Sequence, residues 1–247
     1  MIVDPGPLLF ARYAYPPNAL GYCGPEDHRA LLEYTAAGVV DRGLRELAQG
    51  FEGAWPYLRL IAEAAGIRDP LNRRVVEAYW IGSPLLERVD MARLCNFLDD
   101  RYRPYAGPRL PQLTAAALHG AVPHHNFHVF CVSPWVGLLR SGRITEPLRV
   151  LDRCRIRWGT VIAIEGDTAV VRSRGLVWDG WTVRPGPRRT ERATVATDGL
   201  ATGPIPQPGD VVALHWDRVC DRLDRRSLAA LRHHTRRAIA AAAPLPG

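Results

Sequence analysis

The hydrophobic positions in the first half of the chain recur at helical spacing. From about residue 25 to residue 120, apolar side chains return every three to four residues, the period of an amphipathic helix. Pro25, followed by two acidic residues, and Ser83, followed by a proline, are typical helix starts. The pattern predicts a helical domain over residues 1–148, with helices at 25–49, 54–65, 69–80, 83–101 and 113–119.

After Cys154 the hydrophobic period changes to two, which is typical of strands. Strands are predicted at 158–164, 168–172, 176–183 and 211–215, with a fifth at 193–197. Residues 185–208 are rich in proline, glycine and arginine and are expected to form an insertion or long loop. A closing helix is predicted at 224–243. The sequence therefore predicts an α+β protein in which residues 149–247 form a small OB-like β-barrel with a C-terminal helix.

Composition and charge exclude several classes. The chain has 247 residues, 47% of them hydrophobic, and neither a membrane-spanning apolar run nor a basic leader, so a soluble cytoplasmic protein is expected. All 32 basic residues are arginine, which gives a net charge of +7, but they are interleaved with 25 acidic residues. An arginine-rich barrel that binds nucleic acid is therefore an alternative, although not the favoured one. The phosphate-binding GxxxxGK, the dinucleotide-binding GxGxxG and the serine-hydrolase GxSxG motifs are all absent.

The five cysteines are odd in number and widely spaced, with no CxxC, so a disulfide framework is not expected. One of them stands in the most specific pattern of the chain. Cys154 lies five residues before Gly159, which opens the first predicted strand. Farther on, the segment PGDVVALH ends a strand at His215, and a helix follows.

This layout resembles the HypC/HupF family of small [NiFe]-hydrogenase maturation chaperones. That family pairs a cysteine, a Pro-Gly and a strand with a later PGDxVxxH segment and a C-terminal helix. The resemblance covers residues 152–243, apart from the 185–207 insertion. Two features differ from the family pattern: Cys154 is internal rather than terminal, and Trp158 replaces the proline.

The resemblance implies that Cys154 and His215 bind the iron fragment Fe(CN)₂CO, held transiently. It also implies a HypD-like scaffold protein or a hydrogenase large subunit as partner. A thiolate is a suitable strong ligand for low-spin iron, and imidazole a suitable second ligand. The flanking Arg153, Arg155 and Arg157 are expected to favour the thiolate form of Cys154. A non-catalytic accessory protein is therefore the preferred hypothesis.

Two further groups could bind metal. His124, His125 and His128 form an HHxxH cluster, in which His124 and His128 would share a helix face; a packed loop is the other interpretation. A metal-binding enzyme or sensor that uses this cluster is the alternative function. Cys23 precedes a predicted helix, where the helix dipole would stabilise a thiolate, unless it is simply a buried cysteine. The whole chain also resembles an uncharacterised actinobacterial family that accompanies hydrogenase genes.

Overall fold

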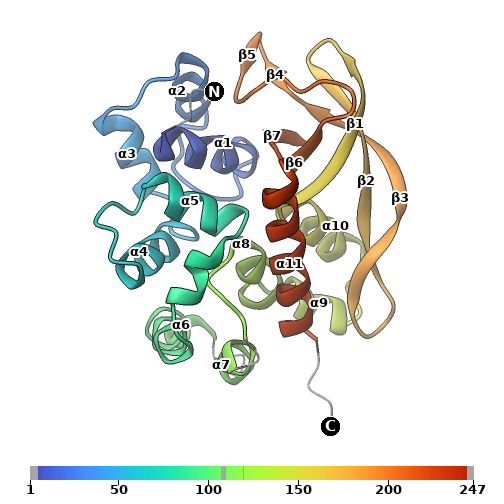
Figure 1. Cartoon of the computed structure of the whole chain (residues 1–247). Coiled ribbons are helices and arrows are strands. Elements are labelled where there is room, and N and C mark those ends of the chain that lie inside the picture. The colour runs from blue at the N-terminus through green and yellow to red at the C-terminus, as the bar shows by residue number, and fades with distance from the viewer. Residues whose placement is uncertain (1–4, 107–109, 119, 244–247) are drawn as a thin grey trace.

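The computed structural model describes residues 5–106, 110–118 and 120–243. Helices make up the part of the chain before the barrel (Figure 1). They are α1 (Gly6–Ala19), α2 (Ala30–Ala37), α3 (Arg42–Gln49), α4 (Trp55–Ala64), α5 (Arg73–Trp80), the 3-10 helix η1 (Pro84–Arg88), α6 (Met91–Ala106), α7 (Leu110–Leu118), α8 (His125–Phe127), the π-helical turn η3 (His128–Val132), α9 (Trp135–Arg140) and α10 (Thr145–Cys154). The predicted helices at 54–65 and 69–80 are confirmed as α4 and α5.

Helix α1 was not predicted, because it has no polar face. All but its last residue are buried, so its sequence lacks the 3.6-residue alternation that marks a surface helix. Pro16 and Pro17 near its end weaken the helical signal further. The helix packs against α2, α3, α5 and the barrel strands β6 and β7, which places it at the centre of the molecule.

The single helix predicted at 25–49 is wrong, because the chain breaks in the middle. Gly38 ends α2 in the left-handed conformation with φ of 66°, and the Asp41 carboxylate accepts a hydrogen bond from Leu44 N to begin α3. The helix predicted at 83–101 is interrupted in the same way. Ser83 caps only the short η1, and α6 starts afresh at Met91.

The strands of the second part form a closed five-stranded barrel in the order β1-β2-β3-β7-β6. They are β1 (Arg157–Glu165), β2 (Thr168–Trp178), β3 (Val183–Thr194), β6 (Val211–His215) and β7 (Arg218–Arg222); β4 (Ala196–Thr197) and β5 (Leu200–Ala201) make a separate small ladder. Neighbouring strands pair antiparallel, except that β3 meets β7 in parallel through Thr194 and Arg218. Gly159 allows the close β1–β2 approach, because a Cβ there would lie 2.4 Å from Val171.

The expected loop at 185–208 is largely wrong. Its first half is β3, which pairs with β2 along ten residue positions and forms the long hairpin at the edge of the barrel (Figure 1). The strand predicted at 176–183 is instead divided between β2, a turn and the start of β3. The prediction failed because the residues of β3 are mostly charged or exposed; cross-strand pairing rather than hydrophobic burial selects the strand.

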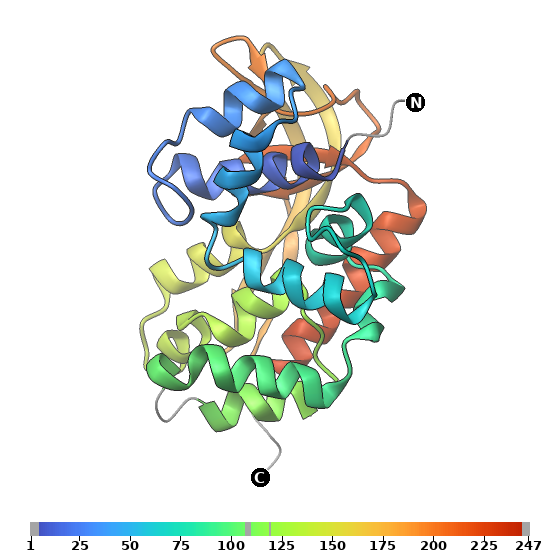
Figure 2. The ribbon, with the colours of Figure 1, turned by 90° about the vertical axis from the view of Figure 1, so that its left-hand side faces the viewer.

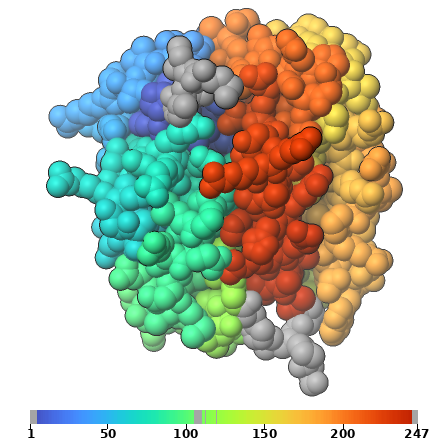
Figure 3. Space-filling view, viewed as in Figure 1, coloured from blue at the N-terminus to red at the C-terminus, as the bar shows by residue number. Residues whose placement is uncertain are grey.

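Helix α11 (Arg225–Ala241) closes the chain, and the Asp224 carboxylate caps it by accepting from Ser227 N. It runs between the helices and the barrel, as both the ribbon and the surface show (Figures 1 and 3). The α+β class, with helices first and a barrel and C-terminal helix after them, is confirmed. No helix in the part of the chain that the structure describes is long and apolar enough to cross a membrane.

The helices and the barrel share a core. One hydrophobic cluster includes Phe10 and Trp80 from the helices together with Ala213 from the barrel and Leu231 from α11. The expected boundary between residues 148 and 149 falls inside α10, which runs directly into β1. The turned view shows the first helices packed across one end of the barrel (Figure 2). The division into two domains, 1–148 and 149–247, therefore stays a prediction.

Candidate metal-binding site

A cavity of about 230 Å³ lies where the helices meet the barrel. Its walls are mainly apolar and include Phe51, Trp80, Trp135 and Trp216. Its polar lining includes the hydroxyl groups of Tyr22 and Ser133 and the side chains of Cys23, Tyr79, His125, His128, Cys154 and His215. A cavity that combines apolar walls with a few converging polar groups is the usual form of a ligand site.

Three of these side chains form a cluster at which a metal could bind. His125 begins α8, Cys154 ends α10 and His215 ends β6. One ligand atom from each lies within 4.8 Å of the other two. Ligand atoms around a tetrahedral metal lie roughly 3.3–3.6 Å apart, given metal–ligand bonds of about 2.0–2.3 Å. The three side chains would have to draw together by up to about 1.5 Å to bind one ion.

Hydrogen bonds to backbone carbonyls fix the tautomers of both histidines. His215 Nδ1 lies 2.7 Å from Tyr13 O, and His125 Nε2 lies 2.8 Å from Cys154 O. Because a carbonyl only accepts, each of these nitrogens carries the proton, and the lone pair is left on His215 Nε2 and His125 Nδ1. This is the arrangement typical of metal-ligating histidines, which donate their other N–H to an acceptor.

The two lone pairs differ in what they contact. His215 is fully buried, and its Nε2 makes no hydrogen bond of good geometry among the described residues, although the backbone of Cys154 lies close to the ring. His125 Nδ1 lies 3.3 Å from the Tyr79 hydroxyl, which is also 3.4 Å from Gly53 O. The Tyr79 hydroxyl can therefore donate to Gly53 O when another group occupies the His125 lone pair.

Burial sets the protonation states of the cluster. It lowers the pKa of His215 to about 4, and together with the charge of His215 it holds the pKa of His125 well below its ordinary value. Burial, followed by the charge of Cys23, raises the pKa of Cys154 to about 12. The cluster at neutral pH is thus two neutral imidazoles and a thiol, and a bound metal would displace the thiol proton.

The expectation that the flanking arginines stabilise a Cys154 thiolate is wrong. Each of them is paired with a carboxylate: Arg153 with Asp217, Arg155 with Asp152 and Arg157 with Glu191. These ion pairs neutralise the cations, so desolvation of the sulfur dominates and its pKa rises.

Cys23 lies at the cavity on the loop between α1 and α2. The loop continues for six residues before α2 begins at Ala30, so no helix N-terminus adjoins Cys23, and the expected stabilisation by a helix dipole does not occur. Although part of the residue is open to solvent, the protein around its thiol raises the pKa of Cys23 to about 12. Cys23 is therefore a thiol at neutral pH.

The HHxxH cluster is divided by the fold. The His124 ring stacks on His234 at 5.3 Å between centroids, and its Nδ1 accepts from Asn126 N; it does not line the cavity. His128 lines the cavity wall, and its Nδ1 lies 3.3 Å from the Tyr57 hydroxyl. His125, between them in sequence, joins the Cys154 cluster. The i, i+4 spacing pointed to His124 with His128, and no local signal could single out His125.

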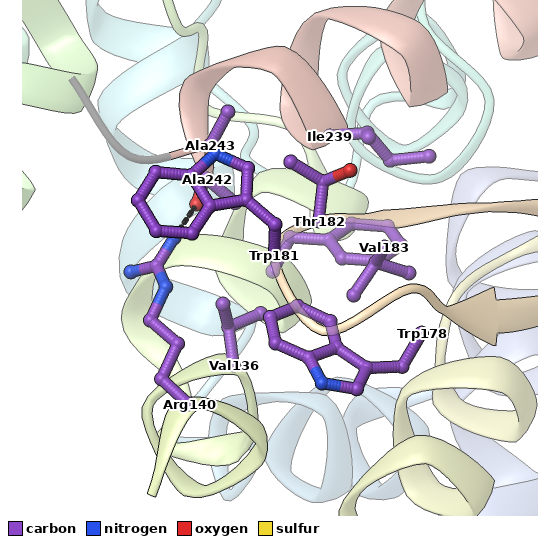
Figure 4. Close-up of a pocket in the computed structure, with 10 residues that line it drawn as sticks. Val136, Arg140, Trp178, Trp181, Thr182, Val183, Ile239, Ala242 and Ala243 are labelled. Atoms are coloured by element: carbon purple, nitrogen blue, oxygen red, sulfur yellow. Dashed lines mark hydrogen bonds between the residues drawn. The ribbon is translucent and has the colours of Figure 1, made fainter. Parts of the chain in front are cut away.

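A second, much smaller cleft lies between the tip of the β2–β3 hairpin and the end of α11 (Figure 4). Trp178, Trp181 and Ile239 line it, and Arg140 donates to Ala242 O across one side at 2.6 Å. Its volume of about 10 Å³ is barely that of one water molecule. The described residues that line it include no histidine, cysteine or carboxylate.

The chain belongs to a family of unknown function, DUF6390, whose model matches residues 2–245. The match therefore includes Cys23, His125, Cys154 and His215. No curated protein and no solved structure matches the chain.

Proposed function

We propose that this protein is a metal-binding accessory protein that holds its cargo at His125, Cys154 and His215. The observation that carries the proposal is the convergence of these three donors, with fixed histidine tautomers, at an apolar cavity. The cargo that we propose is the Fe(CN)₂CO fragment of [NiFe]-hydrogenase maturation. The resemblance of the Cys154 and His215 segments to the HypC/HupF family supports that choice.

The donor set suits iron of this kind. A thiolate with two neutral imidazoles provides one anionic sulfur and two nitrogens, which favours a soft or borderline transition metal over Mg²⁺ or Ca²⁺. Three protein ligands also leave further positions on the metal free for ligands that the protein does not provide.

The size of the cavity supports a cargo larger than a bare ion. A water molecule needs roughly 10–15 Å³ of cavity volume, and the cavity has about 230 Å³. An ion with several diatomic ligands fits such a space, and its mainly apolar walls would exclude bulk water from those ligands.

The chain departs from the HypC/HupF pattern at Cys154, and on this proposal His125 compensates for the difference. Cys154 is internal, so it has no free amino group beside it. The chain before the barrel instead brings in the His125 imidazole, whose Nε2–H is held by Cys154 O itself. On this proposal, the helical part contributes a ligand, and the cargo passes between this protein and a HypD-like scaffold or a hydrogenase large subunit.

The test is infrared spectroscopy of the protein purified without oxygen from a hydrogenase-expressing host. We expect bands in the cyanide and carbonyl stretching region that are absent from Cys154→Ala and from His215→Ala. Cys95→Ala is the matched control, since Cys95 lies on α6 and does not line the cavity, and it should keep the bands. A blank spectrum from folded wild-type protein would refute the iron cargo.

The cluster itself is tested separately with Co²⁺, which gives thiolate-to-cobalt absorption when cysteine is a ligand. Wild-type protein should show this absorption, and Cys154→Ala should not. Cobalt binding with a blank infrared spectrum would leave a metal-binding protein with another cargo, as in the alternative function of a metal-dependent enzyme or sensor.

A further inference from the structure

We propose that Cys23 is the entry ligand of this cavity: it takes up the metal at the mouth and passes it to Cys154 by thiol exchange. The inference rests on the proposed function, because it needs a metal that ends at the His125–Cys154–His215 cluster. It assigns to the loop between α1 and α2 a step in loading that the cluster alone cannot perform.

The two cysteines differ in access. Cys23 is exposed, whereas Cys154 is half-buried and the Nε2 atom of His215 beside it is fully buried. Both cysteines line the same cavity. A donor outside the protein can therefore reach Cys23 directly, while Cys154 is reached through the cavity.

The loop that carries Cys23 is held in a defined position. The Asn18 side chain, fully buried in α1, donates to Cys23 O at 2.9 Å and to Pro25 O at 2.8 Å. Gly24, with φ of 87°, lies so close to Phe51 that an added Cβ would be 2.4 Å from the ring. The backbone on both sides of Cys23 is thus fixed against the cavity wall.

The same loop contacts the cluster from its other side. The Tyr22 ring stacks on Trp216 at 4.2 Å between centroids, and Trp216 follows His215 in the chain. The Tyr22 hydroxyl accepts a hydrogen bond from Arg149 at 3.2 Å. Because the neighbours of Cys23 and of His215 are stacked together, the entry thiol has a fixed relation to the final ligands.

The exchange balances without any oxidant or reductant. At uptake, the Cys23 thiol gives its proton to the departing ligand of the donor as the bond from metal to Cys23 Sγ forms. In the second step, the bond from metal to Cys154 Sγ forms, the bond to Cys23 Sγ breaks, and the Cys154 proton passes to Cys23 Sγ. The metal keeps its oxidation state, and Cys23 is again a thiol.

The experiment follows Co²⁺ transfer from a small aminopolycarboxylate chelate by stopped-flow absorption, with excess chelator. Cys23→Ser should slow formation of the final complex by about tenfold or more. Without Cys23 the metal must pass from the chelate directly to Cys154 in a bimolecular step, instead of moving between two thiols held in one cavity. The equilibrium affinity of this variant should stay within about twofold of wild type, since Cys23 is not a ligand in the final state. Cys95→Ser should match wild type in both loading rate and affinity. Cys154→Ser should retain a weak absorption band that depends on Cys23. The double variant Cys23→Ser/Cys154→Ser should lose this band.

Each outcome decides between the two proposals. If Cys23→Ser loads at the wild-type rate, the relay is refuted while the cluster stands. If rate and affinity fall together, Cys23 is a resident fourth ligand, and the relay is again refuted. If wild-type protein and Cys154→Ser bind cobalt equally, the cluster and the relay both fail. Unfolding midpoints of the variants exclude misfolding as the cause.

Discussion

One short segment, residues 152–157, contributes side chains to two buried polar clusters. The clusters differ in whether their polar groups are paired with one another. Asp152, Arg155 and Arg157 enter an ionic network on the barrel, and Cys154 enters the cavity. In the network each charged side chain has an ion-pair partner: Asp152 pairs with Arg155 and Arg189, and Glu191 pairs with Arg157. Arg155 Nε and Arg157 Nη1 make no hydrogen bond among the described residues. At the cavity the His215 lone pair makes no hydrogen bond of good geometry among the described residues.

Whether a buried polar group is paired distinguishes a structural role from a functional one better than its residue type does. Polar groups that are buried and satisfied stabilise a fold once they are paired, and breaking one pair is costly. A buried polar atom without a partner costs stability until something pairs with it, and beside a cavity a ligand is one such partner. The predictions below test whether the two clusters divide in this way, from the largest expected effect to the smallest.

Breaking the ionic network should cost the most stability. Glu191→Gln leaves the fully buried Arg157 guanidinium without its carboxylate and should lower the free energy of unfolding by roughly 3 kcal/mol. Chemical denaturation measures the loss. The control is Glu165→Gln, whose exposed pair with Arg192 should be worth less than about 0.5 kcal/mol. Equal losses in the two variants would show that the network is not structural.

The same carboxylate should make stability depend on acid pH. Burial alone would raise its pKa, but the charges and hydrogen bonds of Arg157 lower the pKa of Glu191 to about 2. A group with a lowered pKa stabilises the fold above its unfolded pKa of about 4.3, and this stabilisation is lost as pH falls towards 2. Wild-type protein should therefore lose stability across this range more steeply than Glu191→Gln. Parallel curves would contradict the assignment.

The cavity ligands should show the reverse pattern. Cys154→Ala should change the free energy of unfolding by less than about 1 kcal/mol but weaken Co²⁺ binding by about 100-fold or more, since loss even of an outer-shell partner costs 10–100-fold. Isothermal titration and chemical denaturation on the same sample provide the comparison. A large loss of stability with unchanged binding would place Cys154 in the core rather than in a site.

Metal binding should release one proton. His215, with its pKa lowered to about 4, is already neutral above pH 6, whereas Cys154, with its pKa raised to about 12, must lose its proton on binding. The Co²⁺ affinity should therefore rise by about tenfold per pH unit between pH 6 and 9. A slope near two in a plot of the logarithm of the affinity against pH would mean that a second thiol is a ligand at equilibrium.

The smallest effect concerns Tyr79. Its hydroxyl contacts the His125 Nδ1 lone pair, so this hydrogen bond must be given up when a metal binds. Tyr79→Phe should raise the Co²⁺ affinity by up to about fivefold, the value of one net hydrogen bond of about 1 kcal/mol. A weaker affinity in this variant would instead mean that the hydroxyl positions His125 for binding.

The limits of sequence-based prediction are clearest at β3 and α1. Both lack the expected hydrophobic period, for opposite reasons: β3 is mostly exposed and α1 is buried on all sides. Neither pattern alternates, so partners far along the chain decide the structure. The strand β1 was predictable because buried positions alternate along its first half, and β6 because it is a short apolar run, here buried on both faces. Their turns carry glycine.

Local chemistry by itself determined the α+β class and the Asp224 cap of the last helix, because caps, turns and strand periods depend on neighbouring residues. The choice of Cys154 and His215 as a candidate pair came from the resemblance to the HypC/HupF family. Only the tertiary structure decided the rest of the site. It selected His125 over His124, placed Cys23 at the mouth of the cavity, and raised the pKa of Cys154 where its arginine neighbours had suggested a thiolate. The physical reason is that desolvation and ion pairing depend on which distant groups surround an atom, and the linear sequence does not specify them.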